Sequence, residues 1–518
     1  MAGPARLDAR LSATRASKYG LAFLAVLLVA NVHYINRTFD DAFIFFRYAE
    51  NIARGKGWVF TAGERVEAYT SWTWTALLAL AAKLGAARSK MGLVVVAKLG
   101  GIALGAGTVL WVVASSPLVS RRSVNPFRGC VAVLFLTLSA PFALWSVSGL
   151  ETPLAAFLAT MAVHFHLQDR LIAPRPTQWP RSALLFALGV LTRPEIFFLF
   201  AVSAAFDLGR DLAARTLRIN LRANAAWLVA FLLPCLAQLL WRHSYYGQWL
   251  PNTYYAKVDG DPLTWVRGSA YVTSALLDLG LGVTLVAAVL PFALARRVSS
   301  PAAYLLVLEL TYLFVVALEG GDWMPAFRFV VPILPLIALS LDAGVSEALD
   351  RWPTGPGRGL TIALTVLLLA ITSARGVRLV PASRLPSGWK KWLPVPVEQE
   401  QVAHWMNEHL PRRGLLALGE AGVVPYYTEL PVLDLFGLAD LHIAHLPGIR
   451  HHKFDVDYVL GRKPSYVLFA GKDAQGKVAP IFTYSEQLLK SERFAREYRV
   501  CRDFPSFTLY ERAPDADR

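Results

Sequence analysis

Asp40 and Asp41 are adjacent carboxylates that open an aromatic segment, FDDAFIFFRYAENIARGKGWVF, at residues 39–60. A helix through this segment places Arg47 on the same side as Asp40, while neighbouring side chains point about 100° apart. The two carboxylates are therefore expected to have different tasks. One such task is general-base catalysis, in which a carboxylate takes the proton of an attacking hydroxyl. The alternative is a helix at the membrane interface with one aspartate as its N-cap.

Further segments place charged or aromatic side chains beside apolar runs. A charge inside a membrane helix costs about 2.5–3.5 kcal/mol, so such residues usually face a cavity. Lys and Arg suit a phosphate, and Tyr suits sugar contacts. The alternatives are a structural ion pair, snorkelling and an interfacial aromatic belt. The candidates are Arg65 and Glu67 in GERVEAYTSWTW, Glu151 in SGLETPL, Arg193 and Glu195 in LTRPE, Tyr254, Tyr255 and Lys257 in YYGQWLPNTYYAK, and Asp322, Trp323 and Arg328 in GGDWMPAFRFVVP.

Several common catalytic patterns are missing from the sequence. It contains no GxxxxGK[ST], no GxGxxG after a strand, no HExxH and no GxSxG. The three cysteines have no ligand spacing, so they predict neither a metal site nor a disulfide framework. A nucleotide-dependent enzyme is not indicated.

The composition is that of a membrane protein. Of 518 residues, 55% are hydrophobic and 17% charged, against about a quarter charged in a soluble domain. A net charge of +15 fits the basic cytoplasmic loops of such proteins. Nucleic-acid binding is not favoured, because no basic stripe with interleaved aromatic residues occurs in a soluble segment.

The apolar runs predict about eleven transmembrane helices, some of them broken or re-entrant. The first, 21–35, is expected to be retained with its N-terminus in the cytoplasm, which places 36–71 outside. The run 182–206 is expected to break at Arg193–Glu195, around Pro194. Two basic loops flank the run 92–116, so the topology of 87–180 stays open. The remaining runs are 72–86, 129–145, 151–168, 225–242, 274–295, 303–319, 328–345 and 359–376.

The composition changes after residue 376. Residues 377–518 are predicted to form an extracytoplasmic α/β domain, separate from a transmembrane body at 1–376. A helix is expected near 397–409 and strands at 415–419, 432–436, 466–470 and 507–511. Carbohydrate-contact candidates here, which could equally be strand ends and turns, are Glu420, Tyr426, Tyr427, Asp434 and Asp440.

Taken together, these segments resemble the GT-C superfamily, integral-membrane glycosyltransferases that use polyprenyl-phosphate sugars. They are more narrowly similar to the bacterial terminal β-(1→2)-arabinofuranosyltransferase family. The similarity extends from about 39 to 447 and includes GEAGVVPYYTELPVLDLFGLADLHIAH. The acidic pair of the family maps onto Asp40 and Asp41. Trp72 replaces an expected Phe and Ile196 an expected Gly, which are differences of packing.

The resemblance implies an inverting transfer of a sugar, with arabinofuranose as the candidate, from a polyprenyl-phosphate donor to an envelope glycan. The reaction would occur on the extracytoplasmic side of the inner membrane. Asp40 would be the general base, and Asp41 would orient the acceptor, assist the base or bind a divalent cation. Arg47, Lys257 and Arg328 would stabilise the leaving phosphate.

Other functions remain open at this stage. The same fold could use another lipid-linked sugar or a protein acceptor. A different class is a transporter or flippase of lipid-linked glycan, which should show charges along a central path and internal symmetry. A third is an envelope scaffold, for which so many spans are excessive. The sequence leaves oligomeric state, metal dependence, and donor and acceptor identity undetermined.

Overall fold

The structure is a computed structural model that describes residues 38–120, 128–172, 179–258, 261–296, 299–379, 397–450, 452–473, 475–514 and 516. The predicted first helix, 21–35, lies outside these residues. The chain divides into two compact units. Among described residues, unit 1 comprises 98–236 and 263–379, and unit 2 comprises 38–97, 237–262 and 397–516, apart from the gaps given above. Unit 2 therefore combines the C-terminal segment with two earlier segments.

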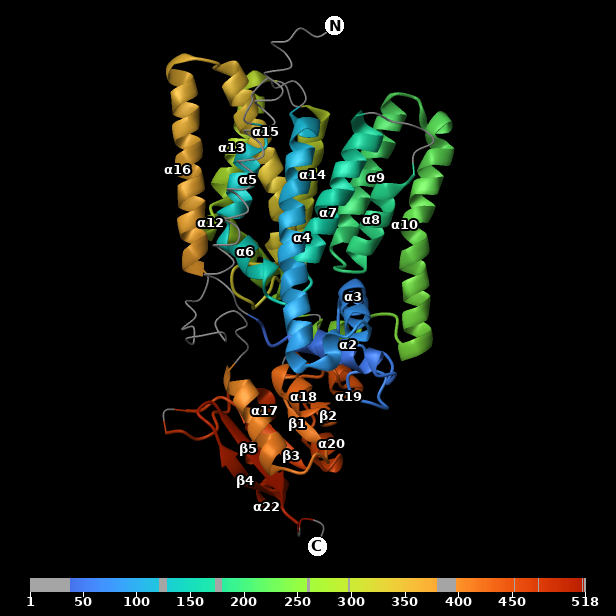
Figure 1. Ribbon diagram of the computed structural model, residues 1–518, viewed down its shortest axis with the longest axis vertical. Coiled ribbons are helices and arrows are strands. Elements are labelled where there is room, and N and C mark those ends of the chain that lie inside the picture. Colours follow the sequence, from blue (N-terminus) through green and yellow to red (C-terminus); the bar gives the residue numbers. More distant parts are fainter. Residues whose placement is uncertain are drawn as a thin grey trace. The chain divides into compact units, whose positions relative to one another are not determined.

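Unit 1 is a bundle of helices in which α8 packs against both α7 and α9 (Figure 1). Its helices are α5 (Cys130–Thr137), α6 (Ala140–Ser146), α7 (Thr152–His166), the π-helix η2 (Leu167–Ile172), α8 (Arg181–Val190), α9 (Ile196–Ala213), α12 (Thr264–Asp278), α13 (Leu281–Ala295), α14 (Ser300–Leu318), the 3₁₀-helix η3 (Arg328–Ile333), α15 (Leu334–Arg351) and α16 (Gly355–Leu379). Two long helices, α4 (Lys90–Val119) and α10 (Leu217–Tyr246), each contribute to both units.

Fewer helices are long enough to span a membrane than the sequence predicted. Among described residues, five helices have the required length and apolar character, or six if the bent pair α12 and α13 is one span. The prediction of a span at 72–86 is wrong, because α3 (Trp72–Lys83) has 12 residues and reaches about 18 Å. The run 129–145 forms two short helices, α5 and α6, which meet near Ser139.

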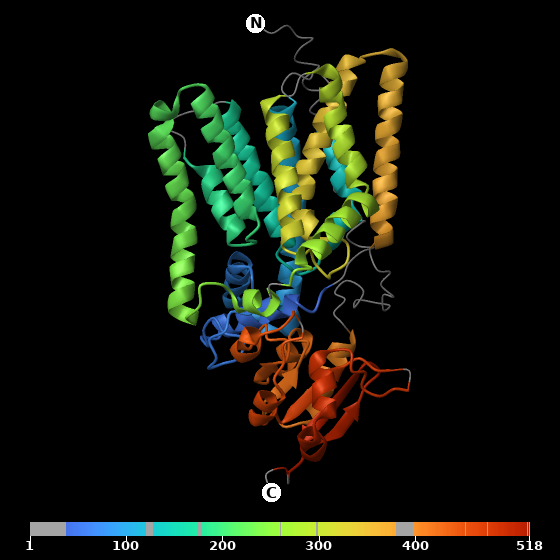
Figure 2. The same cartoon turned by 180° about the vertical axis from the view of Figure 1, so that it is seen from behind.

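The predicted break at Arg193–Glu195 is present between α8 and α9. Pro194 cannot donate a backbone hydrogen bond and so interrupts the helix. A second break was not expected: the predicted run 274–295 is divided between α12 and α13, which are bent by 71° (Figure 2). Gly280 begins α13 with a φ of 69°, a left-handed conformation that favours glycine.

Unit 2 contains a five-stranded sheet of order β2-β1-β3-β5-β4. Its first three strands are parallel and β5 runs antiparallel to both neighbours. The strands are β1 (Leu416–Leu418), β2 (Val432–Asp434), β3 (Tyr466–Ala470), β4 (Tyr498–Asp503) and β5 (Phe507–Arg512). The remaining helices of this unit are α2 (Ala42–Ala53), α3, η1 (Ala86–Arg88), α11 (Asn252–Lys257), α17 (Val397–His409), α18 (Val423–Thr428), α19 (Leu441–His445), α20 (Val456–Gly461), α21 (Thr483–Lys490) and α22 (Glu492–Glu497).

Segments of unit 2 that are distant in sequence are joined by buried polar contacts. The Asn252 amide nitrogen donates to the carbonyls of Gly437, Leu438 and Asp440, at 2.8, 2.9 and 3.2 Å. The Lys453 ammonium donates to the Tyr255 carbonyl at 2.7 Å. These bonds attach α11 to the segment that enters α19.

We expect Asn252→Ala to destabilise unit 2, because it leaves buried carbonyls without their donor. The cost is roughly 1–3 kcal/mol, the penalty for unsatisfied buried polar groups. Thermal unfolding of the full chain in detergent should show a lower midpoint. The exposed Gln475→Ala is the matched control and should leave the midpoint unchanged. Equal midpoints for both variants would contradict this assignment.

Candidate functional site

Asp40 lies one turn before α2 and is held by the segment that begins α18. The Val423 N–H donates to Asp40 Oδ1 at 2.8 Å. A Cβ at Gly422 would overlap the Asp40 carboxylate and its backbone carbonyl, so this position accommodates glycine alone. Asp41 and Glu420 lie within electrostatic range of Asp40. The structure thus brings three carboxylates together at the start of α2.

The half-buried Asp40 carboxylate has a strongly perturbed pKa. Burial and, next, the negative charges of Glu420 and Asp41 raise the pKa of Asp40 to about 8, against the opposing effect of the Gly422 and Val423 hydrogen bonds. Burial also raises the pKa of Glu420, while its bond from Gln399 opposes that change. A carboxylate of high proton affinity is suited to general-base catalysis.

Arg47 occupies the middle of α2 and is buried. Its guanidinium donates to three backbone carbonyls: Nε to Phe60 at 2.7 Å, Nη2 to Leu430 at 2.6 Å, and Nη1 to Pro425. Every guanidinium nitrogen is therefore engaged by the protein. This arrangement favours a structural role for Arg47 over the donor-phosphate role expected from the sequence.

Most of the other candidates in unit 2 contact side chains from other segments of the same unit. Glu67 is buried and pairs with Arg242 at 2.6 Å. Arg65 lies over the Tyr245 ring at 4.8 Å. Tyr255 stacks on His445 with centroids 4.5 Å apart, whereas Tyr254 is 43% exposed. Lys257 is half-buried at the end of α11.

Of the carbohydrate-contact candidates in the C-terminal segment, four bond to other parts of the protein and one lies near Asp40. Asp434 accepts from Phe436 and Ala439 in a turn, and Asp440 caps α19. Tyr426 donates to the Lys90 carbonyl at 3.0 Å, and Tyr427 contacts the Met91 sulfur at 3.3 Å. These four residues therefore make contacts within the fold. Glu420 is the candidate that approaches Asp40.

In unit 1, the break between α8 and α9 carries a buried ionic triad. Arg193 Nε lies 2.5 Å from Glu195 Oε1, and Nη1 lies 2.9 Å from Glu151 Oε1. Arg193 also lies over the Phe329 ring at 4.3 Å. The sequence suggested the Arg193–Glu195 pair, and the structure adds Glu151 from the start of α7.

A second buried pair lies beside this triad. Arg328 at the start of η3 pairs with Asp322 at 2.6 Å and faces the same Phe329 ring at 5.2 Å. Trp323 is 66% exposed and does not join the pair. Arg193 and Arg328 thus both face Phe329, and each carries its own carboxylate partners.

Some buried polar atoms in and beside this cluster lack a hydrogen-bond partner among the described residues. They are Glu151 Oε2, the Thr152 hydroxyl, the Tyr312 hydroxyl, and the ion-paired Asp322 Oδ2 and Arg328 Nε. Since buried polar groups are normally hydrogen-bonded, this part of unit 1 is polar without being fully satisfied.

Sequence reasoning missed Lys98, which is 4% exposed and donates to the Val147 carbonyl at 3.2 Å in unit 1. A single lysine within the apolar run 92–116 was the signal. In the part of the chain that the structure describes, no three His, Cys, Asp or Glu side chains form a group that could hold a metal ion. The divalent cation stays an untested prediction.

The fold matches solved GT-C glycosyltransferases. ArnT from Cupriavidus metallidurans aligns over 98% of this chain and 99% of its own, with a TM-score of 0.57 and 12% identity. The oligosaccharyltransferase AglB from Archaeoglobus fulgidus aligns over 87% of this chain and 69% of its own, at 0.55 and 12%. AftD, an arabinofuranosyltransferase from Mycobacteria, aligns over 95% of this chain and 41% of its own, at 0.52 and 17%. The chain therefore has the GT-C fold, and its apolar helices agree with membrane-protein character.

Two curated relatives confirm the narrower resemblance, since both are named terminal β-(1→2)-arabinofuranosyltransferase. The protein from Mycobacterium tuberculosis is 29% identical over 63% of this chain and 56% of its own length. The protein from Corynebacterium glutamicum is 28% identical over 58% and 46%, respectively. The match thus spans about half the length of these relatives. Residues 394–516 also match a family described as a domain of unknown function (DUF8728).

We expect Arg193→Met to destabilise the protein strongly, because it leaves two buried carboxylates unpaired. Breaking a buried ion pair costs about 3–5 kcal/mol. The measurement is the thermal midpoint of the full chain in detergent. The compensated variant Arg193→Met/Glu151→Gln/Glu195→Gln, in which no charge remains, should recover part of the loss. A triple variant less stable than Arg193→Met would show that the three side chains do not act as an ionic unit.

Proposed function

We propose that the protein transfers a sugar, arabinofuranose being the candidate, from a polyprenyl-phosphate donor to an envelope glycan. The transfer occurs on the extracytoplasmic side of the inner membrane and inverts the anomeric carbon. The observation that carries this proposal is the half-buried Asp40 carboxylate, with its raised pKa, beside Asp41 and Glu420. The named activity of the curated relatives supports it. So do the solved relatives described with undecaprenyl phosphate and dolichol phosphate.

Asp40 acts as the general base. The Val423 N–H fixes the carboxylate through Oδ1. As the hydroxyl oxygen of the acceptor attacks the anomeric carbon, Asp40 Oδ2 takes the proton of that hydroxyl. The bond from that carbon to the donor phosphate breaks in the same step, and the polyprenyl phosphate leaves. Asp41 orients the acceptor. Lys257 and Arg328 are the candidate cations for the leaving phosphate.

Glu151, Arg193 and Glu195 of unit 1 stay candidate substrate-binding residues, as the sequence predicted. The triad with Arg193 and Glu195 holds Glu151 in place. The same residues could bind a lipid-linked sugar other than arabinofuranose. The donor is therefore identified by analysis of the product.

Asp40→Asn should abolish transfer, because the amide cannot take a proton, while its oxygen still accepts the Val423 N–H. We expect a loss of about 10²–10⁴-fold. The purified chain is incubated with polyprenyl-phosphate pentoses and hexoses and a glycan acceptor, and the product mass is measured. Mass gain of one pentose on the acceptor identifies the sugar class.

The control for this substitution is the exposed Asp457→Asn, which should retain full activity. A folded Asp40→Asn protein with wild-type turnover would refute the base assignment. Movement of intact donor between leaflets of proteoliposomes, with no glycosylated product, would favour a flippase instead.

The rate should depend on pH through the ionisation of Asp40. With its pKa near 8, kcat/KM rises with pH as the carboxylate loses its proton and levels off above that value. Glu420→Gln removes a negative charge beside Asp40, so the pKa of Asp40 falls and the midpoint moves to lower pH. The exposed Glu486→Gln should not move the midpoint. A shift to higher pH, or none, in Glu420→Gln would exclude this coupling.

A further inference from the structure

Unit 2 has an open pocket that the proposed reaction does not use, with about 420 Å³ of space when open solvent is included. It lies between the last turn of α2, the loop that follows it, and the chain at the end of α18. Its polar lining includes Glu50, Asn51, Arg54, Lys56 and Glu429. Aromatic and proline side chains form the apolar part of the wall.

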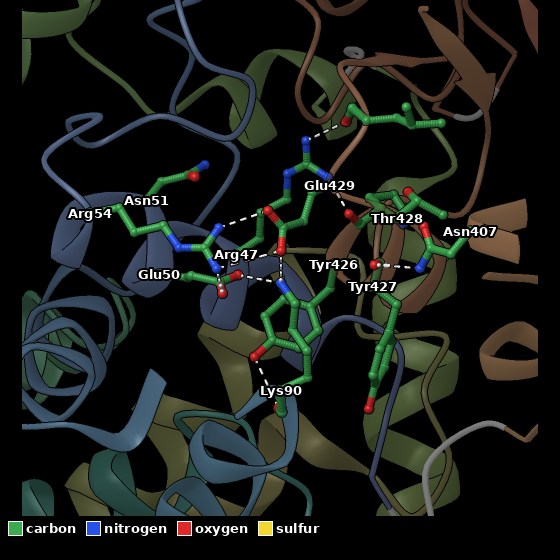
Figure 3. Close-up of polar contacts among 12 residues, drawn as sticks. Arg47, Glu50, Asn51, Arg54, Lys90, Asn407, Tyr426, Tyr427, Thr428 and Glu429 are labelled. Carbon is green, nitrogen blue, oxygen red and sulfur yellow. Dashed lines mark hydrogen bonds and ion pairs between the residues drawn. The ribbon is translucent and has the colours of Figure 1, made fainter. Parts of the chain in front are cut away.

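Three charged residues of the pocket, Glu50, Arg54 and Glu429, form an alternating network with Lys90 beside it (Figure 3). Arg47 and Lys56 also line the pocket. Glu50 lies 2.6 Å from Arg54 and 2.7 Å from Lys90, and Glu429 lies 2.7 and 2.8 Å from the same two cations. Figure 3 shows Glu429 between Arg54 and Lys90. The two cations are therefore neutralised by two carboxylates.

This charge balance decides which ligand the pocket suits. Glu50 and Glu429 already engage Arg54, so a phosphate would have to compete with these two carboxylates for its guanidinium. A neutral sugar meets no such opposition. Arg54 is 40% exposed and Glu429 43%, so one can donate to a ring hydroxyl while the other accepts from it. Lys56 is exposed at the rim and offers a further donor.

The pocket is remote from Asp40. It lies at the other end of α2, and Glu50 and Arg54 follow Asp40 by 10 and 14 residues. At 1.5 Å per residue, the separation along the helix is about 15–20 Å. A single sugar residue cannot bridge that distance, whereas an oligosaccharide chain can.

We propose that this pocket binds a neutral sugar residue of the acceptor glycan, several residues away from the hydroxyl that is attacked. The inference rests on the proposed transferase function and names the acceptor class as an extended oligosaccharide. The enzyme would thus prefer long acceptors over short ones.

The test fills the pocket and compares acceptors of two lengths. Ala62 lines the pocket and is exposed, so Ala62→Trp places an indole in it without disturbing the core. We expect its KM for a synthetic arabinofuranose hexasaccharide to rise about tenfold with kcat unchanged. Its KM for the disaccharide should stay at the wild-type value. Lys56→Ala should raise the hexasaccharide KM less, and the exposed Lys477→Ala not at all.

A second measurement keeps this inference separate from the transferase proposal. Equilibrium titration with a fluorescent hexasaccharide detects binding without turnover, in wild type and in Ala62→Trp. Weaker hexasaccharide binding in Ala62→Trp supports sugar binding at the pocket. If no transfer occurs in the same protein, only the transferase proposal is refuted. Equal effects on both acceptors, or unchanged hexasaccharide binding, would overturn the inference.

Discussion

The contact between Asp40 and the Gly422–Val423 peptide joins residues 383 positions apart in the sequence. It acts on the carboxylate in two ways. The Val423 N–H orients Asp40, and its positive end lowers the pKa that burial and Glu420 raise. Gly422 permits this approach because it has no side chain. Orientation and proton affinity of the candidate base therefore both depend on the C-terminal segment being in place.

Helix α2 connects the acidic pair to two further sets of contacts with the C-terminal segment. Its start holds the acidic pair, its middle holds Arg47, and its end holds Glu50 and Arg54. Arg47 donates to the carbonyl of Phe60, which follows the helix, and to that of Leu430 in the C-terminal segment. Because a helix fixes the spacing of its residues, the acidic pair and the distal pocket keep a constant separation.

The sequence predicted local features better than long-range contacts. Four of the five strands and α17 lie where apolar runs and turn residues indicated, and Pro194 identified the break before α9. Strand β4 was missed because Arg499, Arg502 and Asp503 give it the polar character of an edge strand. The saturation of Arg47 and the approach of Glu420 to Asp40 depend on partners hundreds of residues away. No spacing rule in one sequence predicts such contacts.

The candidate cations differ in what they can still bind. Arg47 uses all three guanidinium nitrogens on backbone carbonyls, so it has no edge for a phosphate. Arg328 Nε lies 2.6 Å from Asp322 Oδ2 as an ion pair, and an arginine fork has further donors on its other two nitrogens. Because Asp322 neutralises its charge, a phosphate role for Arg328 would have to depend on donor geometry more than on attraction. The leaving phosphate gains negative charge only as its bond to the sugar breaks. Guanidinium N–H donors placed for that state stabilise it more selectively than an excess of positive charge, which would also bind the intact donor.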